Sequence, residues 1–387
     1  MKPKQKIYLD YNATTPVDPR VLEEMIPFFT DKFGNFSSRS HAFGWEAEEA
    51  VDIAREQVAS LIGARPSEVI FTSGATEALN LALIGTCRAN QHRGNHLITC
   101  ATEHRAVLDT CHHLEDQGFR VTFLPVDAQG RIDLTELQAA ITDQTILISL
   151  MAANNETGVL HPLEKIAHIA QEQDILFLCD ATQAVGKIPF DMGKLGTDMA
   201  ALSAHKIYGP KGVGALCIRK RPGWYLTPQL FGGGQEKGLR PGTLNVPGIV
   251  GLGKACEIAA AEMEAEGIRL RKLRDQLEGE LTQIKGVQVN GGEAERLPHM
   301  TNLSFAHLDG NRLIRSLKHL ALSRGSACSS VTEKPSHVLT AMGLSEELAL
   351  ASLRIGLGRF TTQEEVEIAT QSIRAAVEKL LLLGAGK

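Results

Sequence analysis

The sequence predicts an α/β protein, with a large domain around a mostly parallel sheet and a smaller α+β domain. Near-continuous apolar segments, typical of buried strands, alternate with segments of helical periodicity in the first half of the chain. Polar motifs follow most of these strands directly, and ligands of parallel sheets bind beyond the carboxyl ends of the strands. At 387 residues, of which 43% are hydrophobic, the chain can form two domains and a sizeable core.

The large domain is expected to span residues 16–255. Its first clear unit is a strand, a glycine-containing turn and a helix between residues 68 and 84. Strands are expected at residues 68–72, 96–100, 119–125, 145–151, 175–179, 198–202 and 211–218, and helices at 18–30, 47–61, 78–84, 105–117 and 163–173.

The composition changes near residue 250, where the chain becomes rich in Ala, Glu, Leu and Arg with helical periodicity to residue 284. We therefore expect residues 1–15 and 256–387 to form the smaller domain. Within it, strands are expected at residues 286–290, 302–305, 320–323 and 352–356, and helices at 311–319 and from about 361 to 383. Thr361 and Thr362 are each followed three residues later by Glu, which offers capping boxes for the last helix.

Charge and cysteine usage exclude several classes of function. The net charge of −5, without a basic stripe, argues against nucleic acid or an anionic membrane as a partner. No apolar signal segment follows the start of the chain, and the apolar runs are too short to span a bilayer. The seven Cys are scattered without a C-x-x-C pair, which argues against a metal cage within the chain. Several read as buried small hydrophobes, and an odd number of thiols suits a reducing, cytoplasmic compartment.

Lys206 lies in a short polar segment between two predicted strands, directly after Ser203, Ala204 and His205. A desolvated lysine forms Schiff bases with carbonyl compounds, and pyridoxal phosphate is the carbonyl cofactor that uses one. Taken alone, the segment favours an ordinary exposed loop lysine, because such lysines are common. The choice depends on whether the chain supplies the other parts of a cofactor site.

Asp180 is the candidate partner of the pyridine nitrogen, which needs a carboxylate to stay protonated. It ends a buried strand, and the nearby Gln183 is placed to donate to the ring phenolate. The same four-residue pattern also fits a helix N-cap. The presence of Lys206 downstream favours the cofactor function over the cap.

The turn Ser73–Thr76 is the candidate phosphate site. Its glycine permits a tight turn, and the N–H groups of Ala75 and Thr76, with the Thr76 hydroxyl, suit an anion at a helix start. Many strand-to-helix turns share this pattern, so it is a weak signal by itself. Ser203 and His205 are further donors for the same phosphate.

His104 follows the strand 96–100, where an imidazole suits stacking on the cofactor ring and proton transfer. A lone histidine is more often a packing or surface residue, and Asn12, Asn155 and Gln183 are equally ambiguous singly. Together these residues make a stronger prediction, because they converge at the ends of the predicted strands.

These motifs together give the chain a family resemblance. The motifs are Thr72–Glu77, Thr102–His104, Asn154–Glu156, Asp180–Gln183 and His205–Gly212. With them, the chain resembles the class V pyridoxal-phosphate enzymes, specifically cysteine desulfurases of the NifS/IscS type. The match runs from Tyr8 to Thr361 and so covers nearly the whole chain. The resemblance implies the type I, aspartate aminotransferase-like fold, a homodimer and sulfur transfer from L-cysteine.

Two further segments resemble the parts of that family that decide the reaction. The segment Ser323–Ser330 looks like the active-site loop, expected at about residues 323–336, with Cys328 as the sulfur acceptor. Its small and polar neighbours differ from those of a buried structural cysteine. Arg354 matches the arginine that binds the α-carboxylate of the substrate, and a guanidinium suits a carboxylate better than an ammonium does. A surface salt bridge is the alternative, but Arg354 lies inside an apolar strand.

The resemblance assigns roles to the remaining residues. It implies that Lys206, Cys328 and His104 are catalytic, with Lys206 also holding pyridoxal phosphate. It places Asn155, Arg354 and Asn12 on the substrate, and Thr243 on the phosphate of the partner subunit's cofactor. The other cofactor contacts that it implies are Ala75, Thr76, His104, Asp180, Gln183, Ser203 and His205. The sulfur is expected to pass as a persulfide on Cys328 to an iron–sulfur scaffold protein.

Three departures from the family pattern concern Pro241, Ala204 and the chain end. Pro241 replaces a serine and removes a backbone donor beside Thr243. Ala204 stands where glycine is common, and residues 380–387 lack a longer tail that many members use to bind a scaffold. Selenocysteine lyase and a non-catalytic scaffold of the same fold remain alternatives. Whether Cys328 also ligates a cluster shared with the scaffold is left open.

Overall fold

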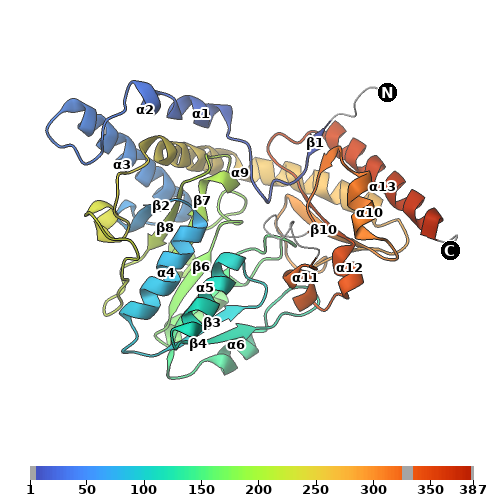
Figure 1. Cartoon of the computed structure of the whole chain (residues 1–387), viewed down its shortest axis with the longest axis horizontal. Helices are drawn as coiled ribbons and strands as arrows, with labels where there is room; N and C mark the ends of the chain where they lie inside the picture. Colours follow the sequence, from blue (N-terminus) through green and yellow to red (C-terminus); the bar gives the residue numbers. More distant parts are fainter. Residues whose placement is uncertain (1–5, 325–333, 385–387) are drawn as a thin grey trace.

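A seven-stranded sheet lies at the centre of the larger part of the molecule (Figure 1). The computed structural model describes residues 6–324 and 334–384. The strand order is β2-β8-β7-β6-β5-β3-β4, in which only β8 runs antiparallel to its neighbours. The strands are β2 (Val69–Thr72), β3 (His96–Cys100), β4 (Arg120–Leu124), β5 (Thr145–Met151), β6 (Leu176–Asp180), β7 (Met199–Ser203) and β8 (Gly214–Ile218).

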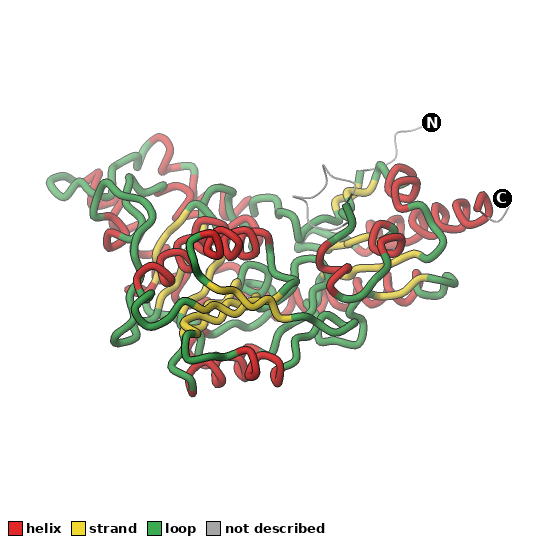
Figure 2. The backbone as a smooth tube through the Cα atoms, turned by 60° about the horizontal axis from the view of Figure 1, so that its bottom comes forward, coloured by secondary structure: helices red, strands yellow, loops and turns green. Residues whose placement is uncertain are grey.

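Helices cover both faces of this sheet, as Figure 2 shows. Successive residues of a strand point to opposite faces, so Ile148 belongs to one apolar cluster and Leu147 to the other. The fold class predicted from the sequence is thereby confirmed. The helices of this part are α1 (Pro19–Met25), α2 (Pro27–Thr30), α3 (Ala42–Ile62), α4 (Ala75–Ala89), α5 (Arg105–Asp116), α6 (Leu134–Ala140), α7 (Leu163–Glu172) and α8 (Met192–Leu195), with short 3-10 turns η1 (Pro66–Glu68), η2 (Ala204–Lys206) and η3 (Gln235–Gly238).

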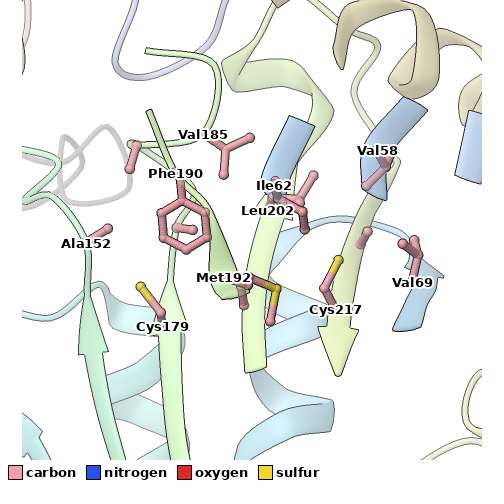
Figure 3. Packing of buried hydrophobic residues seen from close by; sticks show 14 of the residues in the cluster. Val58, Ile62, Val69, Ala152, Cys179, Val185, Phe190, Met192, Leu202 and Cys217 are labelled. Atoms are coloured by element: carbon pink, nitrogen blue, oxygen red, sulfur yellow. The ribbon is translucent and has the colours of Figure 1, made fainter. Parts of the chain in front are cut away.

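The cysteines of the described chain are buried, which confirms their interpretation as small apolar residues. Cys179 and Cys217 pack among Leu202, Phe190 and other side chains of the core in Figure 3. Burial also disfavours the thiolate: it raises the pKa of Cys100 to about 11 and, more strongly, the pKa of Cys179. These thiols are therefore poor nucleophiles.

The C-terminal part contains a second core around an antiparallel sheet of order β12-β10-β9 (Figure 1). The N-terminal strand β1 (Ile7–Tyr8) joins this core and pairs in parallel with β11 (Leu320–Ala321). The other elements are β9 (Val287–Val289), β10 (Met300–Phe305), β12 (Ser352–Gly356), α10 (Gly310–Ser316), α11 (His337–Ala341), α12 (Glu346–Leu350) and α13 (Gln363–Gly384).

The helix α9 (Val246–Leu281) connects the two parts and is 36 residues long. Its first half packs into the core of the large sheet through Cys256, and its second half into the C-terminal core through Leu277. The expected domain boundary at residues 255 and 256 falls inside this helix, so the division of the chain there stays a prediction. No helix in the described ranges combines the length and the apolar character that a membrane crossing requires.

The structure differs locally from the expected elements. The helix expected at residues 18–30 is interrupted at Ile26, because Pro27 has no N–H and starts a new turn. The helix expected from residue 78 begins at Ala75, so that Gly74 becomes its N-cap. The orientation of β8 was not predicted, because hydrophobic pattern carries no information about strand direction.

We expect Leu277→Ala to lower the free energy of unfolding by about 2–5 kcal/mol, because Leu277 is fully buried on α9. Leu382→Ala on α13 is the matched control, since Leu382 is 77% exposed and should change stability by less than about 0.5 kcal/mol. Urea unfolding followed by circular dichroism measures both. Equal effects of the two variants would contradict the packing of α9 described above.

Candidate active site

A cavity of about 520 Å³ lies at the carboxyl ends of β5, β6 and β7, where the sequence predicted a ligand site. Residues from the N-terminal segment and from β12 also line it, so both parts of the molecule contribute. The predicted site residues that line this one cavity are Asn12, Ala75, Thr76, His104, Asn155, Asp180, Gln183, Ser203, His205, Lys206 and Arg354.

The turn at Gly74 brings the start of α4 to the cavity. Gly74 has φ 152°, a conformation that favours glycine. Gly214 lies close beneath it, because a Cβ on Gly214 would stand 2.7 Å from the Gly74 Cα atom. No side chain caps α4, so the N–H groups of Ala75 and Thr76 have no acceptor among the described residues. Such a helix start is suited to an anion.

Lys206 extends from η2, between β7 and β8, as the sequence predicted. Its Nζ donates to the carbonyl oxygens of Asn12 and Ala13, at 2.6 and 2.8 Å. The side chain is partly buried and borders the cavity. Lys206 is therefore held in place by the main chain, unlike an ordinary exposed loop lysine.

Asp180 is the last residue of β6 and is only 6% exposed. Its Oδ1 accepts the N–H of Thr182 at 3.0 Å, but residues 182–187 form turns, so Asp180 is not the helix N-cap considered as the alternative. Its Oδ2 accepts no hydrogen bond from the described residues, and Asp180 borders the cavity. One carboxylate can thus cap the turn and still serve a ligand.

His104 is the N-cap of α5, and its Nδ1 accepts the N–H of Ala106 at 3.1 Å. Burial lowers the pKa of His104, and the charges of Asp180 and Lys206 act in opposite directions on it. A neutral ring with an acceptor at Nδ1 carries its proton on Nε2. The imidazole at the cavity is therefore suited to give up or receive a proton at Nε2.

Asn12 contacts more residues of the site than the sequence indicated. Its main-chain oxygen accepts from Lys206 and, at 3.1 Å, from Gln183 Nε2. Its Nδ2 lies 3.4 Å from Gln183 Oε1 and 3.3 Å from Nε2 of His299, a buried residue that sequence reasoning missed. His299 carried no local signal, since it lies in the stretch before β10 and approaches Asn12 only through the fold.

Arg354 lies on β12 and is 1% exposed, so the surface salt bridge considered as its alternative is excluded. Its Nη1 donates to the Asn155 carbonyl oxygen at 3.0 Å and its Nη2 to Asp10 Oδ1 at 2.8 Å. Asp10 is a second residue that sequence reasoning missed. The pairing of a buried guanidinium with a carboxylate offsets part of its desolvation cost.

The structure does not place Thr243 in the cavity of its own chain, and it does not describe Cys328. Thr243 is exposed in the segment between η3 and α9 and does not line the cavity of its own chain, so its role toward a partner subunit stays a prediction. Cys328 lies outside the described residues. Residues on either side of it are placed near the cavity: Ser323 forms an antiparallel bridge with Arg354, and His337 Nε2 contacts the Glu103 carbonyl oxygen at 3.0 Å.

The comparison with protein families decides the identity of the fold. The family model of the aminotransferase class-V proteins matches residues 7–368. This chain belongs to that family. The match includes β1, the cavity residues and only the start of α13, and it confirms the resemblance inferred from the motifs.

The most similar relatives include proteins named cysteine desulfurase IscS. One from Anaeromyxobacter dehalogenans is 54% identical over 97% of this chain and 94% of the relative. One from Pectobacterium carotovorum is 52% identical over the same shares. Among solved structures, a NifS-like protein has a TM-score of 0.90 and 41% identity over 97% of this chain and 100% of its own. A structure of SspA in complex with cysteine has a TM-score of 0.81 and 40% identity over 92% of this chain and 100% of its own.

Pyridoxal phosphate, the cofactor of this family, fits the residues of the cavity. The start of α4 offers unsatisfied N–H groups for the phosphate, and Lys206 offers an amine for the aldehyde. The open carboxylate oxygen of Asp180 suits the pyridine nitrogen, and the ring of His104 suits stacking. The cavity thus offers a suitable group for the phosphate, the aldehyde, the ring nitrogen and the ring face of the cofactor.

The pH dependence of the free energy of unfolding should reveal the lowered pKa of His205. Burial first, and then the charges of Lys206 and Lys211, lower the pKa of His205 to about 4. The unfolded chain therefore binds this proton at higher pH, and the free energy of unfolding should fall as the pH drops from about 7 to about 4. In cofactor-free protein, His205→Asn should show a smaller fall in urea unfolding. An equal fall in both proteins would show that His205 is not the source.

Proposed function

We propose that this protein is a pyridoxal-phosphate-dependent cysteine desulfurase, which converts L-cysteine to L-alanine and passes the sulfur through Cys328 to an acceptor protein. The observation that carries the proposal is the convergence of Lys206, Asp180, His104 and Arg354 on one cavity. Relatives named cysteine desulfurase, 51–54% identical over nearly the full chain, support the same activity.

The cofactor supplies an electron sink for the pair of electrons released when the substrate loses its Cα proton. The amine of Lys206 would hold the cofactor aldehyde and, with the substrate bound, would accept the Cα proton at Nζ. The free oxygen of Asp180 keeps a proton on the ring nitrogen. The N–H groups of Ala75 and Thr76 bind the phosphate, with Ser203 and His205 as further donors.

Arg354 binds the α-carboxylate of L-cysteine. Its Nε is buried and has no hydrogen-bond partner among the described residues, so it offers a donor to a ligand in the cavity. Asn155, whose carbonyl oxygen accepts from Arg354, and Asn12 line the same cavity. This arrangement favours a small α-amino acid as the substrate.

Cys328 is the sulfur acceptor in this proposal. The six cysteines of the described chain are buried, and burial raises the pKa of thiols such as Cys111, to about 12. The thiolate of Cys328 attacks the substrate Sγ; the Cβ–S bond breaks, an S–S bond forms on Cys328, and L-alanine leaves. His104 moves the thiol protons at Nε2.

The partners of the protein belong to the same proposal. A homodimer, in which Thr243 reaches the phosphate site of the other subunit, explains why Thr243 does not line the cavity of its own chain. The acceptor of the Cys328 sulfur is an iron–sulfur scaffold protein, and the enzyme acts in the cytoplasm. Pro241, beside Thr243, is buried and donates no N–H to the phosphate.

Cys328→Ala tests the sulfur step. We expect it to lower the production of L-alanine and sulfide from L-cysteine at least about a hundredfold, since the nucleophile contributes most of the rate. The scaffold protein should raise turnover of the wild type and leave the variant unchanged. Cys256→Ala is the matched control, because Cys256 is a buried thiol on α9 and should be dispensable for turnover. Full activity of Cys328→Ala would favour the alternative, a selenocysteine lyase that needs no acceptor thiol.

Borohydride reduction of the purified holoenzyme tests the lysine. Reduction followed by peptide mapping should place the pyridoxyl label on Lys206. Lys187 is the competing amine, since burial lowers its pKa to about 8 and makes it a reactive lysine, but it does not line the cavity. A label on Lys187, or a colourless protein that takes no label, would contradict the proposal.

A further inference from the structure

Asp10 holds the arginine of the substrate site. The Asp10 Oδ1 atom lies 2.8 Å from Arg354 Nη2, and the Asn155 carbonyl oxygen lies 3.0 Å from Nη1. These two contacts fix the plane of the guanidinium, because they hold its two terminal nitrogens from different elements. The Nε atom stays buried and without a partner among the described residues. The guanidinium is thus oriented before any ligand arrives.

The position of Asp10 is set by the main chain. Asp10 and Gly356 form a parallel bridge, two residues along β12 from Arg354. The Gly356 N–H donates to the Leu9 carbonyl oxygen at 2.8 Å, and the Tyr11 N–H donates to the Gly356 carbonyl oxygen at 3.3 Å. The neighbouring side chains, Leu9 and Tyr11, are buried. The carboxylate is therefore carried on a rigid support.

We propose that Asp10 is a positioning residue of the substrate site: its carboxylate fixes the Arg354 guanidinium so that the free Nε edge receives the α-carboxylate of the substrate amino acid. This rests on the proposed function, which makes L-cysteine the substrate. A long arginine side chain loses rotamer freedom when it binds a ligand, and Asp10 and Asn155 remove that freedom in advance. Substrate affinity should then depend on Asp10 although Asp10 does not line the cavity.

Two effects of Asp10 oppose each other. Its contact orients Arg354, whereas its negative charge weakens the attraction of the guanidinium for a second carboxylate. The Asp10 side chain is 18% exposed against 2% for Arg354, so solvent screens the charge of Asp10 more than that of Arg354. The orientation of Arg354 should therefore affect substrate affinity more than the negative charge of Asp10 does. Asp10→Asn separates the two effects, because asparagine keeps an acceptor oxygen in the same place and loses the charge.

The test compares two ligands on the holoenzyme, with dissociation constants measured from the cofactor absorbance. L-Alanine carries the carboxylate, and ethylamine is the same amine without it. We expect Asp10→Ala to raise the dissociation constant of L-alanine at least about tenfold and to keep that of ethylamine within about twofold of the wild type. Asp10→Asn should raise the dissociation constant of L-alanine by less than about threefold. In turnover, Asp10→Ala should raise KM for L-cysteine more than it lowers kcat.

The control is Asp127→Ala, which removes another aspartate paired with an arginine, Arg131, at 3.0 Å on the surface. It should change neither dissociation constant. Equal weakening of both ligands by Asp10→Ala, or unchanged L-alanine binding, would overturn the proposal. If Asp10→Ala does not fold, Asp10→Ser should show the same selective loss of L-alanine. A wild type without desulfurase activity would refute the proposed function, while the L-alanine titration would still decide the role of Asp10.

Discussion

The contact between the N-terminal segment and the loop of Lys206 is the constraint on which the site depends. The carbonyl oxygens of Asn12 and Ala13 hold the Lys206 amine, and Thr15 Oγ1 donates to the His205 carbonyl oxygen while it accepts the Tyr208 N–H. At its other end the same segment packs into the C-terminal core through Leu9. It therefore ties the loop between β7 and β8 to the part that carries Arg354.

A group of buried charges supports this contact from behind. Tyr208 has φ 66°, an uncommon backbone conformation for a residue with a side chain, so the surroundings must hold it there. Arg359 lies 4.3 Å and Lys187 4.5 Å from the centre of the Tyr208 ring, and the Tyr208 hydroxyl donates to Glu266 at 3.2 Å. Charged and aromatic groups thus fix the residue that follows the Lys206 loop.

The sequence predicted most strands of the large sheet and many of the residues that line the cavity. Asp180 ends a buried strand, and His104 and Lys206 come shortly after two others, so strand prediction alone places them at one edge of the sheet. Asn12, Asn155 and Arg354 were placed in the site by the family resemblance, and the fold brings them to the same cavity. The starts of α5 and α7 agree with the sequence prediction, whereas those of α3 and α4 were missed, because periodicity defines the middle of a helix better than its ends. The roles assigned to Thr243 and Cys328 remain predictions.

Local pattern determined the α/β class, the strand ends that carry polar groups and the kinds of groups a pyridoxal-phosphate site needs. These are properties of short segments, and hydrophobic periodicity and turn chemistry encode them directly. Only the tertiary structure decided that Asp10 holds Arg354 and that His299 lies against Asn12. Both contacts join residues more than two hundred and eighty positions apart. They depend on how two cores pack across one segment, and no local pattern records that.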